Sequence, residues 1–149
     1  MRTLGLDIGD RRIGVAVSDP LGMLARPLTV LERVEDSAAV EAIIKLVKEF
    51  QISKIIAGWP LLMNGTTGGQ AEKVRQFIEK LQAVLDLPVE FRDERLTTAT
   101  ARDMLAAGSK KKAKFEKKGQ YDAAAAAIIL QSYLNESRPM VFPDNRDTP

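Results

Sequence analysis

Four carboxylates at three places in the chain are the side chains best suited to chemistry: Asp7, the adjacent pair Asp93 and Glu94, and Asp122. The chain has 149 residues and contains no histidine and no cysteine. Their absence excludes Ser-His-Asp and Cys-His nucleophilic sites, histidine general bases, thiolate zinc sites and disulfides. Catalysis here must therefore use carboxylates, hydroxyls, lysines, backbone amides or a metal ion held by oxygen ligands.

Alternating apolar residues near the N-terminus predict three consecutive strands. The segments 3–8 and 12–18 both alternate and flank a short turn that contains glycine, which is typical of a β-hairpin. A third strand is expected over 26–33, where Pro27 suits an edge strand or a strand start. Together these segments predict an antiparallel meander.

The middle of the chain alternates between helical and strand patterns. Apolar residues at helical spacing predict amphipathic helices over 37–50, which Asp36 or Ser37 would cap, and over 70–85. A short apolar run over 53–58 lies between them and predicts a buried strand of a parallel pair.

The last part of the chain predicts one more strand and two helices. A strand is expected over 88–92, and Thr97 would cap a helix that Gly108 closes. A lysine-rich connection over 109–118 then leads to a helix over 121–134, which is apolar almost all round and should be buried.

This order of elements predicts an α/β fold of the mixed type. We expect a five-stranded sheet, with an antiparallel meander followed by parallel strands and with helices on both faces. One domain is expected over 1–135, followed by a flexible tail over 136–149. The sequence shows no signal peptide and no apolar run of membrane-spanning length, which favours a soluble cytoplasmic protein that does not associate with membranes.

This arrangement would bring the four acids together. Ligands of open α/β sheets bind beyond the carboxyl ends of the parallel strands, and the first and last parallel strands end at Asp7 and at Asp93 and Glu94. Asp122 begins the buried helix and could reach the same edge. Carboxylates that converge repel one another unless a hard divalent cation neutralises them, so the pattern predicts a Mg²⁺ or Mn²⁺ site.

Each acid also has a simpler interpretation. Asp7 could form the turn at the end of its strand, Asp93 and Glu94 could lie in a solvated loop beside two arginines, and Asp122 could interact with a helix dipole. The six lysines within 110–118 could likewise be a solvated connection, although they precede Asp122 and suit a polyanionic substrate. Convergence at one sheet edge favours the metal site.

Four ordered motifs make the chain resemble the YqgF/RuvX family from about Leu4 to Leu134. They are GLDIG with RIGVAVSD near the N-terminus, GxP with NG over 58–65, DERLTT over 93–98, and Asp122 followed by an Ala-rich helix that ends in ILQxYL. Leu62 departs from the polar residue usual in that family, and Trp59 replaces a common leucine. Both departures concern the loop and leave the acids unchanged.

The resemblance implies a ribonuclease H-like fold related to RuvC-type Holliday-junction resolvases. It implies a nuclease that depends on Mg²⁺ or Mn²⁺ and trims the 5′ end of precursor 16S ribosomal RNA during ribosome biogenesis, or alternatively resolves branched DNA. Where the motifs match, the resemblance implies three catalytic acids, which are Asp7, Glu94 and Asp122. It also implies that the metal ion is held by these three acids and by Asp93. Residues placed to contact substrate are Arg12, Arg95, Thr97, Lys117 and Lys118.

Two other functions stay open at this point. The modest net charge of +2 and the altered 58–65 loop are compatible with a weakly catalytic nucleic-acid-binding assembly factor. An ATP-binding fold of the actin and sugar-kinase type is disfavoured, because such proteins enclose the nucleotide between two domains and this chain has the length of one. The choice between RNA and DNA, the cleavage position, the preferred metal, and a monomeric or homodimeric state are left undetermined.

Overall fold

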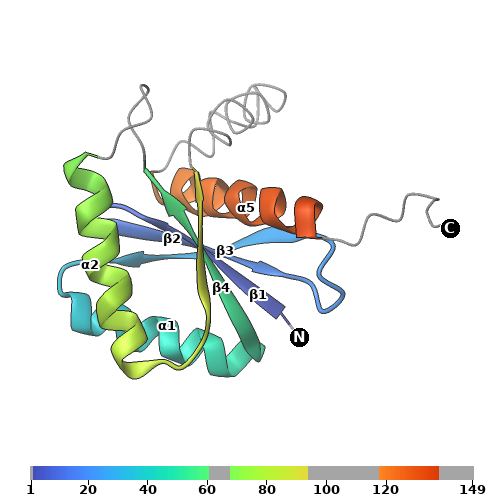
Figure 1. Ribbon diagram of the computed structural model, residues 1–149, viewed down its shortest axis with the longest axis horizontal. Coiled ribbons are helices and arrows are strands. Elements are labelled where there is room, and N and C mark those ends of the chain that lie inside the picture. Colours follow the sequence, from blue (N-terminus) through green and yellow to red (C-terminus); the bar gives the residue numbers. More distant parts are fainter. Residues whose placement is uncertain (1, 61–67, 94–117, 138–149) are drawn as a thin grey trace, which may run out of the picture.

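A computed structural model describes residues 2–60, 68–93 and 118–137, with side chains of the last segment described over 122–136. Five strands form one mixed sheet in the order β3-β2-β1-β4-β5, with helices on both faces (Figure 1). This confirms the predicted sheet. The elements are β1 (Arg2–Ile8), β2 (Arg12–Ser18), β3 (Ala25–Glu32), α1 (Asp36–Phe50), β4 (Ile52–Trp59), α2 (Gly69–Val84), β5 (Val89–Asp93) and α5 (Lys118–Ser137).

Strand pairing follows the predicted combination of a meander and parallel crossovers. β1 pairs with β2 and β2 with β3 in antiparallel fashion, and the tight turn after β1 is closed by Gly9 N–H donating to the carbonyl of Arg12 at 2.9 Å. β4 pairs with β1 and β5 with β4 in parallel. The carboxyl ends of β1, β4 and β5 therefore lie at one edge of the sheet, as the site prediction requires.

The main hydrophobic core lies between the sheet and the two amphipathic helices α1 and α2. Alternate strand residues face this side because successive side chains of a strand point to opposite faces. The stripe predicted on each helix packs onto them. Large buried members of this core include Leu4, Leu6, Ile13, Val15, Val17, Ile43, Ile55, Phe77 and Leu81.

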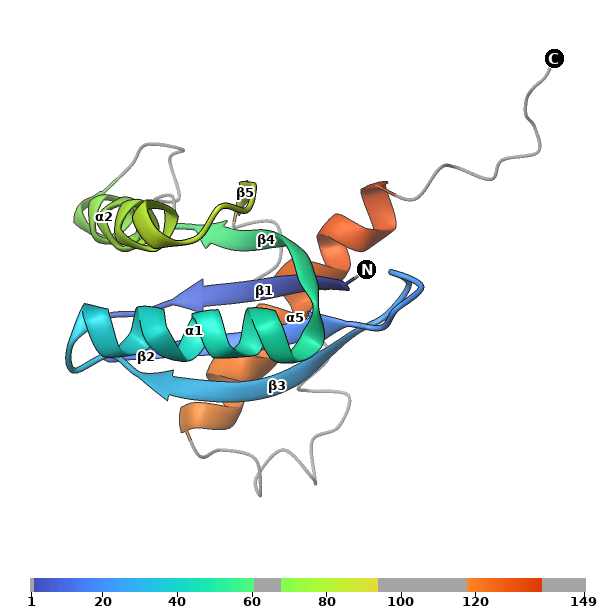
Figure 2. The same cartoon turned by 90° about the horizontal axis from the view of Figure 1, so that it is seen from below.

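The opposite face of the sheet carries small residues and receives α5, which runs diagonally across it (Figure 2). Ala16 and Ile56 pack there against Ala126, Ile129 and Leu130. Gly5 is required by this close approach, since a Cβ at that position would lie 2.8 Å from the Cβ of Leu130. Despite its apolar character, α5 covers the sheet, and no helix in the described ranges is both long and apolar enough to span a membrane.

Helix boundaries differ from the prediction at two places. The N-cap of α1 is Glu35, not Asp36 or Ser37, and Asp36 instead makes ion pairs with Arg33 and Lys80, each at 2.9 Å. α5 begins at Lys118 instead of residue 121 and continues to Ser137, three residues beyond the predicted end at 134. The helix expected over 97–108 and the lysines over 110–117 lie outside the described residues.

The ion pairs of Asp36 predict a pH-dependent contribution to stability. The hydrogen bond from Arg33, reinforced by Lys80, holds the pKa of Asp36 below its ordinary value of 3.8. A carboxyl with a lowered pKa stabilises the fold above its unfolded-state pKa, and this stabilisation is lost as the pH falls through the folded-state value. Asp36→Asn should therefore lower the free energy of unfolding by about 1 kcal/mol at pH 7, with the difference shrinking below pH 3.8.

Urea titrations of the parent and of Asp36→Asn at pH 7 and pH 3 would measure this difference. Glu41→Gln is the matched control, because Glu41 is an exposed carboxylate of the same helix that makes no ion pair with any described residue. It should leave stability nearly unchanged. A constant difference between Asp36→Asn and the parent at both pH values would contradict the assignment.

Candidate functional site

Asp7 lies at the carboxyl end of β1 and points to the α5 face of the sheet. Its neighbours Leu6 and Ile8 are buried in the core under α1 and α2, and the alternation of the strand directs Asp7 the other way. Its side chain is half-buried. In the antiparallel register Asp7 pairs with Gly14 of β2, so both residues belong to the same face.

Asp122 reaches this position because Gly14 has no side chain. A Cβ at Gly14 would lie 1.9 Å from the carbonyl oxygen of Asp122 and 2.2 Å from its carbonyl carbon. The backbone of α5 therefore lies directly on β2, beside the residue that pairs with Asp7. The structure thus brings Asp7 and Asp122 to the same end of the same face, although Asp122 lies in the second turn of α5 and not at the predicted helix start.

Arg12, predicted to contact substrate, lies within this group of acids. Its Nε donates to Oδ2 of Asp122 at 2.7 Å, with side chains that are 37% and 28% exposed. Arg12 and Gly14 are two residues apart on β2 and so share the α5 face. Sequence patterns do not reveal this ion pair, because 110 positions separate its two members.

Strand β5 positions Asp93, one of the two adjacent acids that the sequence could not tell apart. Asp93 pairs with Trp59, which packs with the core under α1 and α2 and meets Phe91 edge-on at 4.9 Å between ring centroids. Asp93 therefore belongs to the face opposite Asp7 and Asp122. The preceding residue, Arg92, is on the α5 face.

Arg92 connects β5 to the C-terminal part of α5. Its guanidinium donates to Oγ of Ser132 and to Oε1 of Glu136, both at 2.9 Å. The hydrogen bond between Arg92 and Glu136 lowers the pKa of Glu136 and raises that of Arg92. Because α5 also carries Asp122, this contact ties the end of β5 to the helix that completes the site.

Several predicted site residues cannot be compared with the structure. Those outside the described residues are Glu94, Arg95, Thr97 and Lys117. Lys118 is the first residue of α5, and its side chain is also outside the described part. Their assignments stay predictions.

The described acids have the donor chemistry of a hard cation site. Asp7 and Asp122 offer only carboxylate oxygens, the ligands that Mg²⁺ and Mn²⁺ prefer. Within the described residues, no group of three or more carboxylates is placed to hold a metal ion. Two carboxylates fit an ion such as Mg²⁺, which is commonly held by one or two carboxylates together with water and substrate phosphates.

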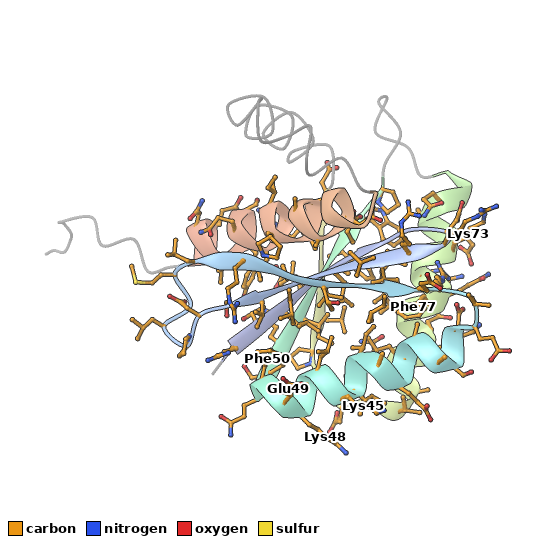
Figure 3. The ribbon with its side chains drawn as sticks, turned by 180° about the vertical axis from the view of Figure 1, so that it is seen from behind. Lys45, Lys48, Glu49, Phe50, Lys73 and Phe77 are labelled. Carbon is orange, nitrogen blue, oxygen red and sulfur yellow. The ribbon has the colours of Figure 1, made fainter. Side chains whose placement is uncertain are left out.

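Arg33 supports the turn that follows Asp7, a role that sequence patterns did not suggest. Its guanidinium donates to the carbonyl of Gly9 at 2.9 Å and lies 5.0 Å from the ring centroid of Phe77. Lys73, one helical turn before Phe77, lies beside the turn and approaches Asp10 at 3.4 Å (Figure 3). With Arg11, Arg12 and Glu32, Arg33 lines a hollow of about 360 Å³.

Comparison with known sequences shows similarity along most of the chain. The family model described as RuvX, Holliday junction resolvase, matches residues 1–136. A protein of Roseiflexus sp. (strain RS-1) is 43% identical over 92% of this chain and 96% of its own length. One of Clostridium novyi is 45% identical over 91% of this chain and 98% of its own length. Both bear the name "Putative pre-16S rRNA nuclease".

Solved structures show a similar fold at low sequence identity. Thermus thermophilus RuvC in complex with a Holliday junction substrate aligns with a TM-score of 0.62 and 16% identity, covering 92% of this chain and 96% of that one. Fowlpox virus resolvase with junction DNA aligns with a TM-score of 0.58 and 13% identity, covering 93% and 100%. These likenesses establish a RuvC-like, ribonuclease H-type fold and confirm the expected fold class.

Proposed function

This chain belongs to the RuvX family, and on that premise we propose that it is a divalent-metal-dependent nuclease that processes the 5′ end of precursor 16S ribosomal RNA. The placement of Asp7 and Asp122 at one end of the α5 face carries the proposal. The names of the relatives support the RNA substrate. Such a function belongs in the cytoplasm, where bacterial ribosomal RNA is made.

Asp7, Glu94 and Asp122 are the proposed ligands of the ion. Asp7 and Asp122 share a face, whereas Asp93 is on the other one. This favours Glu94 over Asp93 as the acid that the last strand contributes.

The protein groups have separate roles in the proposed reaction. A bound divalent cation would neutralise phosphate charge and lower the pKa of the attacking water. Asp7 is oriented by β1 and Asp122 by α5, so both carboxylates are positioned before substrate binds. Arg12 supplies a guanidinium suited to a phosphate oxygen. Since the chain has no histidine, a carboxylate or solvent must take the proton of the attacking water.

The two acids at the end of β5 should differ in their effect on cleavage. Glu94→Gln should reduce the rate at least about a hundredfold, because it removes a charged ligand, whereas Asp93→Asn should stay within about threefold of the parent. Single-turnover cleavage with Mn²⁺ measures both variants, and they serve as controls for each other. A larger loss of cleavage rate in Asp93→Asn than in Glu94→Gln would assign the metal-ligand role to Asp93.

Resolution of branched DNA is the second candidate, because the matched family is described as a Holliday junction resolvase. Labelled precursor 16S ribosomal RNA and a four-way DNA junction should be incubated side by side, with product ends mapped on each. Cuts at the 5′ boundary of 16S RNA with an intact junction are the expected result. Paired, symmetric cuts in the junction with intact RNA would favour the DNA function instead. Cleavage of neither would favour a binding or assembly role.

A further inference from the structure

We propose that Arg12 is a placeholder cation, a residue that occupies the Asp122 carboxylate until a divalent ion binds and then turns to the substrate backbone. The inference rests on the proposed metal-dependent function and assigns its order of events. The nucleic-acid phosphodiester group is the ligand that the released guanidinium would take. Arg12 would thereby couple metal binding to substrate binding.

The ion pair has the properties of an interaction that can exchange. Arg12 Nε and Asp122 Oδ2 are 2.7 Å apart, but more than a third of the arginine side chain is exposed. Among the described residues, Asp122 is the partner that holds this guanidinium. An ion pair with this exposure contributes about 1 kcal/mol or less to stability, so breaking it is easy.

Other arginines near the site lack this combination of features. Arg33 is held by Gly9 and Asp36 and is only 10% exposed. Arg92 is held by Ser132 and Glu136 and is 15% exposed. The guanidinium groups of Arg33 and Arg92 therefore stabilise the fold. Arg12 alone among these three bonds to a proposed metal ligand while its side chain stays accessible.

Two cations at one carboxylate repel each other, which gives the exchange its driving force. A divalent ion on Asp122 would stand within a few ångströms of the guanidinium, where Coulomb repulsion is strong and poorly screened. The guanidinium would leave Asp122 and become available to a phosphate oxygen of the substrate. Guanidinium groups bind phosphate oxygens in bidentate fashion. By linkage, metal and substrate would each increase the affinity for the other.

Titration of the metal-free chain with Mn²⁺ alone tests the competition, using the parent, Arg12→Gln and Arg11→Gln in 0.15 M KCl. Arg12→Gln should bind Mn²⁺ about tenfold more tightly, because the competing cation is gone. Arg11→Gln removes the same charge from the neighbouring exposed residue, which makes no ion pair with a described residue. Screening should limit its effect to about twofold.

A measurement on the parent protein avoids any effect of the variant on folding. The Nε–H signal of Arg12 in a nitrogen–proton correlation spectrum should move when Mg²⁺ is added. The signals of Arg33 and of Arg75, which pairs with Glu72 and Glu79 on α2, should stay in place. A further shift is expected when a short DNA duplex is added in the presence of Mg²⁺. The signal that is missing from the spectrum of Arg12→Gln identifies the Nε–H of Arg12.

Three results would overturn the inference, and they differ from a failure of the proposed function. Unchanged or weaker Mn²⁺ affinity in Arg12→Gln would show that the guanidinium does not compete. Equal gains in Mn²⁺ affinity in Arg12→Gln and Arg11→Gln would show that the effect comes only from the loss of one positive charge. If the protein binds Mg²⁺ but the Arg12 signal does not move, the ion pair between Arg12 and Asp122 persists in the metal-bound state. By contrast, a parent chain that binds no Mn²⁺ would remove the metal site itself, and this inference with it.

Discussion

Asp7→Asn should reduce the rate of phosphodiester cleavage by about a thousandfold while the protein stays folded. Asparagine keeps the shape of the side chain but removes its charge and one ligand oxygen. Asp7 is half-buried at the end of β1, beside Gly14 and the backbone of Asp122. Loss of this charge should weaken both metal binding and the stabilisation of the transition state.

The matched control for this variant is Asp10→Asn. Asp10 lies three residues further along, in the turn that follows β1, but its side chain is 58% exposed and it interacts with Lys73 at 3.4 Å. Single-turnover cleavage of labelled precursor RNA with Mn²⁺, together with calorimetric titration of Mn²⁺, should show Asp10→Asn close to the parent and Asp7→Asn inactive. An Asp7→Asn variant that cleaves at the parental rate would show that the activity comes from elsewhere.

Local patterns were sufficient to predict the sheet and the helices on both of its faces. Alternation over 3–8 and 12–18, and the helical stripe that includes Ile43 and Phe77, reflect directly which side chains are buried. Such patterns are strong because one face of each element must be apolar. Helix ends were less predictable, since Asp36 has two partners in space that compete with its role as a cap.

The site itself was predictable only in part. The rule that ligands bind at the carboxyl ends of parallel strands made Asp7 a candidate, and it led to Asp122 as a second candidate through the expected position of the helix. The rule could not foresee how α5 approaches the sheet, which depends on Gly14 and not on any acid. It also could not foresee the ion pair of Arg12, because no local pattern connects residues so distant in sequence.

The face on which an acid lies proved as informative as its position along the chain. Asp93 and Glu94 are adjacent in sequence and equal in charge, and composition cannot separate them. The contacts of Trp59 and of Arg92 assign the two faces of β5, because each contact involves a different layer of the molecule. A strand end therefore predicts where acids gather, and side-chain alternation places Asp93 on the face opposite Asp7 and Asp122.

Gly14→Ala should disrupt the fold more than alanine at Gly5, Gly9 or Gly69. The added Cβ would lie 1.9 Å from the carbonyl oxygen of Asp122 and 2.2 Å from its carbonyl carbon. These are backbone atoms of a helix, so no side-chain rotation relieves the overlap and α5 must move away from the sheet. We expect a loss of about 3 kcal/mol in the free energy of unfolding, which urea titration would measure.

Alanine variants of two other glycines serve as comparisons for the loss of stability in Gly14→Ala. Gly69→Ala at the start of α2 meets nothing within 4 Å, so it should be nearly neutral. Gly5→Ala would bring its Cβ 2.8 Å from the Cβ of Leu130 and 3.0 Å from the carbonyl oxygen of Ala126. It should be destabilising, but less so than Gly14→Ala, because its overlaps are smaller. Equal stability of all three variants would contradict the close packing of α5 on the sheet.

Gly14→Ala should also lose activity beyond what its stability explains. The comparison is made at a temperature where both variants stay folded. In Gly14→Ala, the displaced N-terminal part of α5 would carry Asp122 away from Asp7. Gly5→Ala would instead disturb the helix near its middle. Cleavage and Mn²⁺ affinity should therefore fall more than tenfold in Gly14→Ala and much less in Gly5→Ala. A folded Gly14→Ala protein with parental Mn²⁺ affinity would mean that Asp122 does not hold the ion. The glycine thus tests the ligand assignment without changing any charged residue.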